Sequence, residues 1–200
     1  MTSSNYHHGD LKQALIKVAN HVLSQGEIEK LSLRQLAKAC NVSATAVYRH
    51  FDNKQSLLTQ LAANGFDAFT EYMKNDLQPD DSPVTQLQKI GTAYVNFALK
   101  NPHLFRLLFS SLLTSQHQSE SLEKSGKKNH DLLTNIITNG IKQNVFSGDP
   151  ETLSLAAWSM VHGLATLLVD NALEAGQETH TDSIIKAVTG FLYSGILVKA

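Results

Sequence analysis

Apolar residues recur at steps of three and four along most of this chain, which is the spacing of one face of an α-helix. The steps begin at Leu11 and continue toward the last residues, with breaks at Gly26, Pro79, Pro102 and Pro150. No segment of any length alternates apolar and polar residues as a half-buried strand does. The pattern therefore predicts an all-α fold with about nine helices.

Two short helices are predicted between Ser32 and Phe51. Ser32 and Gln35 form a capping box at the start of the first, and Ser43 caps the second. Asn41 lies at the turn between them, where a residue must tolerate left-handed backbone geometry. Two short helices joined by a tight turn form a helix-turn-helix, whose second helix enters the major groove of DNA.

The second short helix has one side suited to DNA. If Val47 and Phe51 face the core, Ala44, Thr45 and Tyr48 face outward, and small residues let the helix backbone approach base edges. The donors that reach a guanine or a phosphate come from Arg34, Tyr48, His50 and Lys54. Helix-turn-helix pairs without a role in DNA binding are common in all-α proteins, so the spacing alone leaves both interpretations open.

Charge and composition narrow the function classes. Residues 1–60 hold seven basic and four acidic residues, a balance of +3, although the whole chain carries −1, which suggests a polyanion contact at one end. Cys40 is the single cysteine, and the chain has no HExxH, GxSxG or GxGxxG motif, so no enzyme activity, metal or cofactor is predicted. We see no signal peptide and no stretch long enough to span a bilayer, and expect a cytoplasmic protein without membrane contact.

Four runs of residues resemble one family. Residues 6–11 (YHHGDL), 31–37 (LSLRQLA) and 42–54 (VSATAVYRHFDNK) resemble the N-terminal domain of TetR-family transcriptional regulators. Residues 158–164 (WSMVHGL) resemble the Trp-x-x-x-His-Gly signature of one class of C-terminal domain in that family. Asn41 stands where many members have glycine, and asparagine tolerates the same geometry.

The resemblance implies a homodimer with a DNA-binding domain over 1–54 and a ligand-binding and dimerisation domain over 55–200, linked by a long helix over 54–78. By position in the family, Arg34, Ala44, Thr45 and Tyr48 would meet bases, and Ser32, Tyr48, His50 and Lys54 would meet phosphates. The full set predicted to contact DNA is Ser32, Arg34, Ser43, Ala44, Thr45, Tyr48, Arg49, His50 and Lys54.

The last two predicted helices are apolar around much of their circumference, and such helices are buried on several sides. We expect two helices from each subunit to form a four-helix dimer interface. The alternative is that they form the core of a monomer. The residues predicted at the interface are Leu155, Val161, Leu164, Leu168, Ile185, Val188 and Leu192.

The middle helices are rich in aromatic residues. A ring of aromatic side chains around a void suits an apolar or aromatic ligand, although these side chains can equally fill their own core. His162 is expected to be a hydrogen-bonded core histidine and not a metal ligand. The residues predicted to line a ligand pocket are Phe69, Tyr72, Tyr94, Phe97, Phe105, Phe109, Trp158 and His162.

These observations predict a sequence-specific DNA-binding regulator. We expect a repressor that leaves a near-palindromic operator when a small, apolar or aromatic effector binds. One alternative is an all-helical dimer that binds a ligand or a protein and has no role with DNA. A second alternative is a DNA-binding protein that acts as an activator, or in cell division, without an effector.

Overall fold

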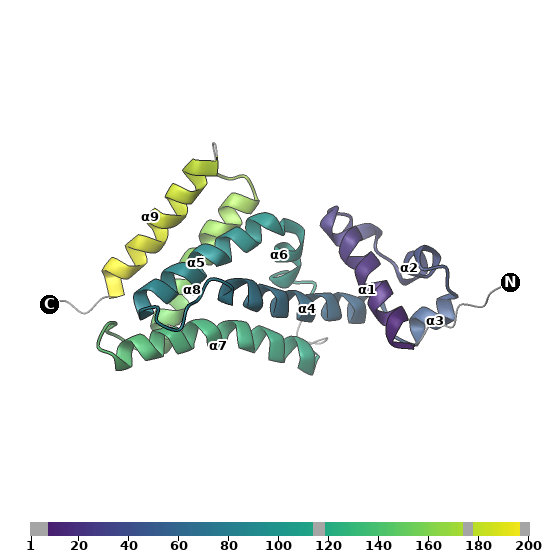
Figure 1. The fold of residues 1–200 in the computed structure, drawn as a ribbon. Coiled ribbons are helices and arrows are strands. Elements are labelled where there is room, and N and C mark those ends of the chain that lie inside the picture. The colour runs from purple at the N-terminus through teal and green to yellow at the C-terminus, as the bar shows by residue number, and fades with distance from the viewer. Residues whose placement is uncertain (1–7, 114–118, 174–177, 197–200) are drawn as a thin grey trace. The chain divides into compact units, whose positions relative to one another are not determined.

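The computed structural model describes residues 8–113, 119–173 and 178–196. These residues form nine α-helices and one short 3-10 helix and contain no strand, as Figure 1 shows. The all-α prediction is therefore confirmed. The chain divides into two compact units, each described by itself. The N-terminal unit runs to Gly65 and includes His103–Glu123, and the C-terminal unit holds Phe66–Pro102 and the residues from Lys124 onward.

The N-terminal unit buries the apolar faces of its short helices in one core. Leu15, Leu36, Val47 and Leu57 are each at most 1% exposed, and burying a side chain of this size stabilises the fold by roughly 1.5–3 kcal/mol. Its elements are α1 (His8–Ser24), the 3-10 helix η1 (Ile28–Lys30), α2 (Leu33–Ala39), α3 (Ala44–Tyr48), the first part of α4 (Lys54–Lys74) and most of α6 (Pro102–Leu108).

This division differs from the boundary predicted at residue 54. Leu57, Leu58 and Leu61, in the first part of α4, are buried in the core of the N-terminal unit. Leu107 of α6 is buried in the same core, and Leu104 packs against it. The segment around α6 therefore contributes to the folding of the N-terminal unit, although it lies far along the chain.

The turn of the helix-turn-helix forms as its sequence predicts. The Ser32 hydroxyl accepts a hydrogen bond from the backbone N–H of Gln35, at 3.2 Å, and the Ser43 hydroxyl accepts one from Ala46, at 3.2 Å. Asn41 has a φ of 53°, the left-handed geometry expected there. The capping box differs in one detail, because the Ser32 hydroxyl donates to the Gln35 side-chain oxygen at 3.1 Å.

The C-terminal unit is built around α5 (Pro83–Lys100), which packs against α8 (Pro150–Val169) and α9 (Glu178–Ile196). Gly91 permits this close packing, since a Cβ there would lie 3.2 Å from the Thr189 methyl group. Most of α7 (Glu120–Lys142) belongs to the same unit. It ends at Lys142, and Phe146 packs over Gly140 after Asn144 takes a φ of 56°.

Helix α8 is long and apolar enough to cross a membrane, by length and composition alone. This corrects the expectation that the chain has no such stretch. Serine, threonine and histidine residues interrupt the apolar run of α8, but the helix carries no charged residue from Thr152 to Val169. Core helices pass the same test, and α8 packs against α5 and α9.

Candidate DNA interface and ligand-binding region

The outer side of α3 is exposed while its inner side anchors it. Val47 is fully buried and Phe51 is 3% exposed, and both belong to the core of the N-terminal unit. Ala44, Thr45 and Tyr48 are exposed, and 47% of Tyr48 is accessible. The predicted orientation of this helix is therefore confirmed. With Val47 buried and Tyr48 exposed, α3 presents a polar and aromatic side to the solvent.

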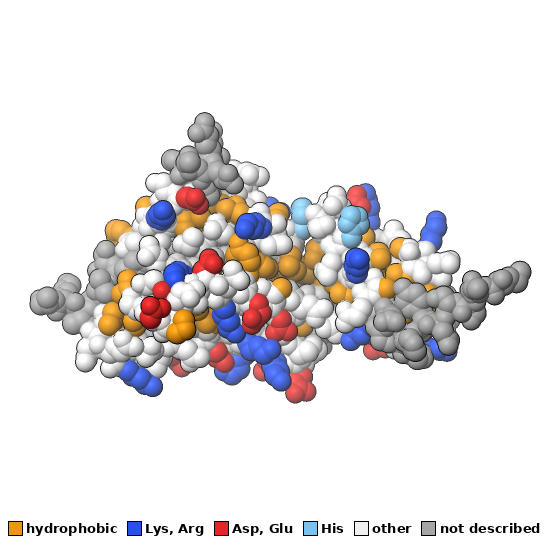
Figure 2. Space-filling view, in the orientation of Figure 1, with side chains coloured by type: hydrophobic (Ala, Val, Ile, Leu, Met, Phe, Trp, Pro, Cys, Tyr) orange, Lys and Arg blue, Asp and Glu red, His pale blue; other side chains and the backbone are white. Residues whose placement is uncertain are grey.

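The other predicted donors lie beside this surface. Arg34, in the first turn of α2, and Arg49, which follows α3, are exposed. Ser43 accepts a backbone hydrogen bond through its oxygen, which leaves its own hydroxyl proton available to a phosphate. Ser32 instead donates its proton to Gln35. Figure 2 shows that the charged side chains in view on the N-terminal unit are mostly basic, whereas both signs are interspersed on the C-terminal unit.

Lys54 has a structural contact that sequence spacing did not indicate. Its ammonium, in the first turn of α4, donates to the carbonyl oxygens of Ile28 at 2.8 Å and Glu29 at 3.4 Å. These carbonyls belong to η1, so Lys54 ties η1 to the start of α4. An ammonium has three donors. One N–H therefore remains for the phosphate contact that the sequence predicts.

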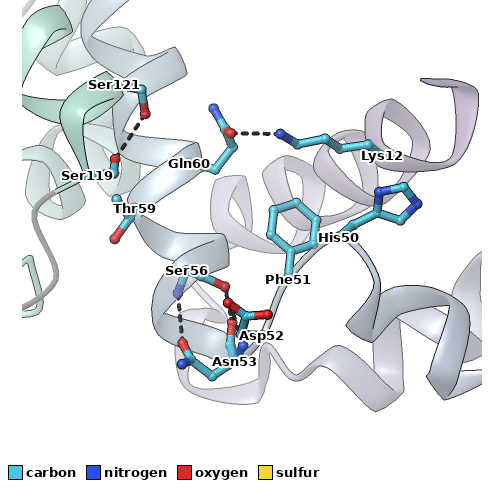
Figure 3. A pocket seen from close by; sticks show the side chains of 10 residues that line it. All are labelled: Lys12, His50, Phe51, Asp52, Asn53, Ser56, Thr59, Gln60, Ser119 and Ser121. Atoms are coloured by element: carbon cyan, nitrogen blue, oxygen red, sulfur yellow. Dashed lines mark hydrogen bonds between the residues drawn. The ribbon is translucent and has the colours of Figure 1, made fainter. Parts of the chain in front are cut away.

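His50 lines a polar pocket of about 400 Å³ in the N-terminal unit, together with Lys12 and residues of α4 (Figure 3). Lys12 was missed by the sequence analysis. Its ammonium donates to the Gln60 side-chain oxygen at 3.0 Å and lies 6.0 Å from the centre of the Phe51 ring. In the sequence, Lys12 is one basic residue on the polar side of the first predicted helix. Many surface lysines lie in such positions, so this pattern does not single it out.

The predicted aromatic pocket is divided between the two units. Phe69, Tyr94 and Phe97 are each at most 4% exposed, and their ring centres lie 4.8 Å (Phe69–Tyr94) and 4.3 Å (Phe69–Phe97) apart. Rings at these distances are in direct contact, which fits the alternative that they fill their own core. Phe105 and Phe109 pair with each other at 5.1 Å in the N-terminal unit. The eight residues are therefore not brought together in one unit.

A chain of hydrogen bonds joins α5 to α8 inside the C-terminal unit. The Trp158 indole N–H donates to the Tyr94 hydroxyl oxygen at 3.2 Å, and that hydroxyl lies 2.9 Å from His162 Nδ1. Burial raises the pKa of Tyr94 and lowers the pKa of His162. Because the Tyr94 oxygen accepts the indole N–H, the Tyr94 hydroxyl proton is available to His162 Nδ1. The prediction of a hydrogen-bonded histidine is confirmed, and no metal-binding cluster occurs among the described residues.

Part of the predicted dimer interface is corrected. Val161, Leu164, Leu168 and Ile185 are at most 7% exposed within a single chain, because α8 and α9 pack against α5 and against each other. Among the remaining predicted residues, Leu155 is 57% exposed and Val188 is half-buried, while the side chain of Leu192 lies outside the described residues.

Two exposed apolar residues on these helices were not among the predicted interface residues. Leu167 is 45% exposed and Phe191 is 78% exposed. Leu155, Ser159, Gly163 and Leu167 are all exposed and follow one another at intervals of four residues, so they form one stripe along α8. We call these four residues the α8 stripe.

A short, exposed second helix behind a tight turn places this chain among helix-turn-helix proteins, the class of fold that reads DNA with one helix. Two protein-family models that match the chain identify its family. Residues 15–61 match the model for bacterial regulatory proteins of the tetR family, and residues 87–191 match the tetracyclin repressor-like C-terminal domain. The chain belongs to the TetR family of DNA-binding transcription regulators, whose members typically dimerise and are generally not enzymes.

Individual relatives agree with this assignment. The chain is 22% identical over 193 residues to the uncharacterized HTH-type transcriptional regulator YobS of Bacillus subtilis, covering 96% of this chain and 95% of YobS. A solved protein of unknown function from Rhodococcus sp. RHA1 is 28% identical with a TM-score of 0.85, covering 98% of this chain and all of that one. A tetR-family regulatory protein from Rhodococcus RHA1 has a TM-score of 0.70 at 19% identity, covering 99% of this chain and 100% of that one.

Proposed function

We propose that this chain is a repressor that binds a near-palindromic operator as a homodimer and leaves it when a small molecule binds the C-terminal unit. The observation that carries the proposal is the exposed Tyr48 side of α3, held outward by buried Val47 and Phe51. A surface of this kind buries little within the chain itself. It gains contacts when the helix lies in a major groove.

Recognition of bases by this surface relies on few side chains. Ala44 offers a methyl group to thymine, Thr45 offers a hydroxyl as well as a methyl, and Arg34 can donate two hydrogen bonds to guanine. Tyr48 and Ser43 donate to phosphates, which position the helix without reading sequence. We therefore propose that phosphate contacts provide much of the affinity and that affinity falls steeply with salt.

Dimerisation is proposed to use the α8 stripe together with Phe191 of α9. Leu155, Leu167 and Phe191 are large apolar side chains left exposed by a single chain, and a second copy that covers them removes apolar surface from water. Ser159 and Gly163 between the leucines let two helices approach closely. Two reading helices about 34–36 Å apart then fit successive major grooves.

The experiment is binding to fragments of the source genome, including the region upstream of its own coding sequence, measured by electrophoretic mobility shift. We expect at least one fragment to bind well above bulk DNA. Tyr48→Phe tests the hydroxyl alone, and Tyr48→Ala removes the ring as well. Tyr48→Ala should weaken specific binding about tenfold or more, with unchanged circular dichroism because the side chain is exposed.

Two results would favour other functions. If no fragment binds more tightly than bulk DNA, the chain is better explained as an all-helical dimer that binds a ligand or protein. If a fragment binds and its gene is transcribed less when the regulator is deleted, the chain acts as an activator. We also propose a cytoplasmic location and no catalytic activity, as is general for the family.

A further inference from the structure

A groove of about 500 Å³ runs along the outer side of α5 in the C-terminal unit. It is bounded by the end of α4, by the loop that follows α4, and by α9. Most of the residues that line it have polar side chains, in contrast to the aromatic core described above. The uncharged polar side chains that α4, α5 and the loop contribute include Tyr72, Asn75, Thr85, Thr92 and Asn96.

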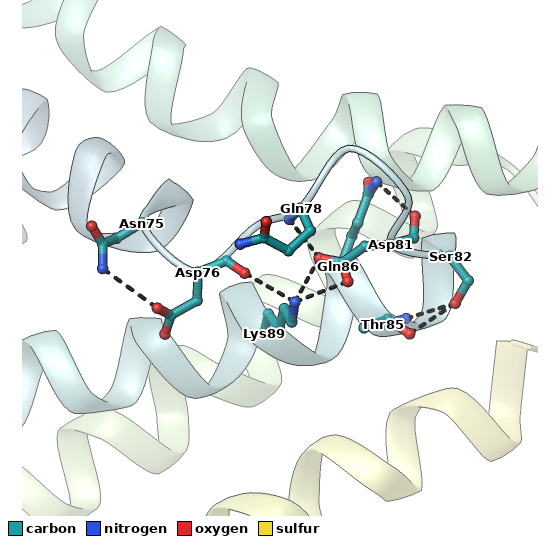
Figure 4. Close-up of polar contacts among 8 residues, drawn as sticks. All are labelled: Asn75, Asp76, Gln78, Asp81, Ser82, Thr85, Gln86 and Lys89. Carbon is teal, nitrogen blue, oxygen red and sulfur yellow. Dashed lines mark hydrogen bonds and ion pairs between the residues drawn. The ribbon is translucent and has the colours of Figure 1, made fainter.

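One wall of the groove is fixed by an ion pair. The Lys89 ammonium lies 2.8 and 2.7 Å from the two carboxylate oxygens of Asp81 and donates to the Asp76 carbonyl at 2.9 Å (Figure 4). Asp81 also accepts the backbone N–H of Gln78 at 2.8 Å. The hydrogen bond from Lys89 is the main reason that the pKa of Asp81 is lowered. Lys89 therefore holds the loop against α5, and its charge is neutralised by Asp81.

Two other lysines, Lys100 and Lys186, give the groove a net positive charge. Lys100 donates to the Tyr72 hydroxyl at 2.9 Å, and its ammonium lies 5.3 Å from the centre of the Tyr72 ring. This hydrogen bond is the main cause of the raised pKa of Lys100, which keeps the ammonium charged. Lys186 of α9 is exposed, and within the described residues its ammonium has no ion pair or hydrogen bond. The Asp76 carboxylate opposes these two charges, so the groove carries a net charge of about +1.

We propose that this groove binds a small hydroxylated anion, whose carboxylate or phosphate contacts Lys100 and Lys186. Its hydroxyl groups then bind the amide and hydroxyl side chains along α5. Ammonium groups suit either anion, because both present oxygen acceptors to a point charge. The proposal that this groove binds an anion does not depend on DNA binding. Its role as the effector site rests on the function proposed above. The effector class then differs from the apolar or aromatic one expected from sequence.

The test is isothermal titration of the full chain with gluconate, glucose 6-phosphate and uncharged glucose. We expect at least one of the two anions to bind about tenfold or more tightly than glucose, since a charge-assisted hydrogen bond is lost with glucose. The two anions distinguish a carboxylate from a phosphate ligand. Equal affinity for glucose and both anions, or no binding of either anion at millimolar concentration, would overturn the proposal.

Two variants show whether the anion occupies this groove. Lys186→Gln removes one ammonium without disturbing an internal contact, and we expect about tenfold weaker binding of the anion. Lys142→Gln removes an exposed lysine in the last turn of α7, outside the groove lining, and should leave the affinity unchanged. An equal effect of the two substitutions would contradict the location. DNA release is followed separately by fluorescence anisotropy, and binding without release would leave the site in place and contradict only the ligand-released repressor.

Discussion

Replacing Lys54 by methionine tests a residue to which sequence and structure give different roles. The Lys54 ammonium donates to the Ile28 and Glu29 carbonyls at 2.8 and 3.4 Å. A hydrogen bond to a charged group contributes roughly 1.5–3 kcal/mol, but Lys54 is only half-buried and the second contact is long. We therefore expect Lys54→Met, which keeps the apolar stem, to lower the free energy of unfolding by about 1 kcal/mol. Urea denaturation followed by circular dichroism measures this change.

The same variant also tests the phosphate contact. Neutralising one phosphate contributes about 0.9 to the slope of log affinity against log salt concentration. If the third N–H of Lys54 binds a phosphate, Lys54→Met flattens this slope by about that amount. Fluorescence anisotropy with an operator fragment at several salt concentrations measures the slope, at a temperature where both proteins are folded.

The matched control is Lys142→Met, which removes the same charge from an exposed position of α7. It should change neither the unfolding free energy nor the slope. Wild-type stability in Lys54→Met would refute the reasoning that Lys54 anchors η1. A lower stability with an unchanged slope would keep the anchor and remove Lys54 from the residues that contact phosphate.

Substitutions at three further positions test the α3 cap, the dimer interface and the histidine. Ser43→Ala removes the α3 cap and should cost about 1 kcal/mol of unfolding free energy in urea denaturation, while Ser43→Asp retains stability; equal stability of all three proteins would argue against the cap. Leu167→Glu places a charge on the α8 stripe and should give a folded monomer in analytical ultracentrifugation, and an unaffected dimer would contradict this interface. The pKa of His162 is lowered from 6.5 by burial, so the unfolded chain takes up this proton first and stability falls as the pH drops below about 6.5. His162→Gln should reduce that fall in urea midpoints measured at several pH values, and an identical fall would exclude His162 as its source.

Local chemistry made the helix-turn-helix predictable. The Ser32 and Ser43 caps and the positive φ of Asn41 depend on residues within a few positions of one another, and the structure contains all three. The inward positions of Val47 and Phe51 follow from their spacing of four residues. None of these features required knowledge of a distant partner.

Local sequence patterns could not predict contacts between distant residues or the buried face of a uniformly apolar helix. Ile28 and Lys54 are 26 positions apart, and nothing in the sequence pattern pairs them. On α8, Leu164 is buried and Leu167 is 45% exposed. A helix that is apolar all round gives no contrast between its faces, so periodicity cannot say which face meets the chain's own core. The aromatic residues failed for a related reason, since composition does not distinguish a packed core from a lined cavity.

The polar groove also sets a condition on how a ligand can regulate DNA binding. A ligand shifts an equilibrium only by the difference between its affinities for the two states. To weaken operator binding tenfold, the anion must therefore bind the DNA-free arrangement about tenfold better, a difference of about 1.4 kcal/mol. One charge-assisted hydrogen bond, made by Lys100 or Lys186 in only one arrangement, is of that size. Helix α4 supplies Lys54 to the N-terminal unit and Tyr72, which holds Lys100, to the C-terminal unit. By reciprocity, operator DNA must weaken binding of the anion by the same factor, and titration of the anion with and without operator measures it directly.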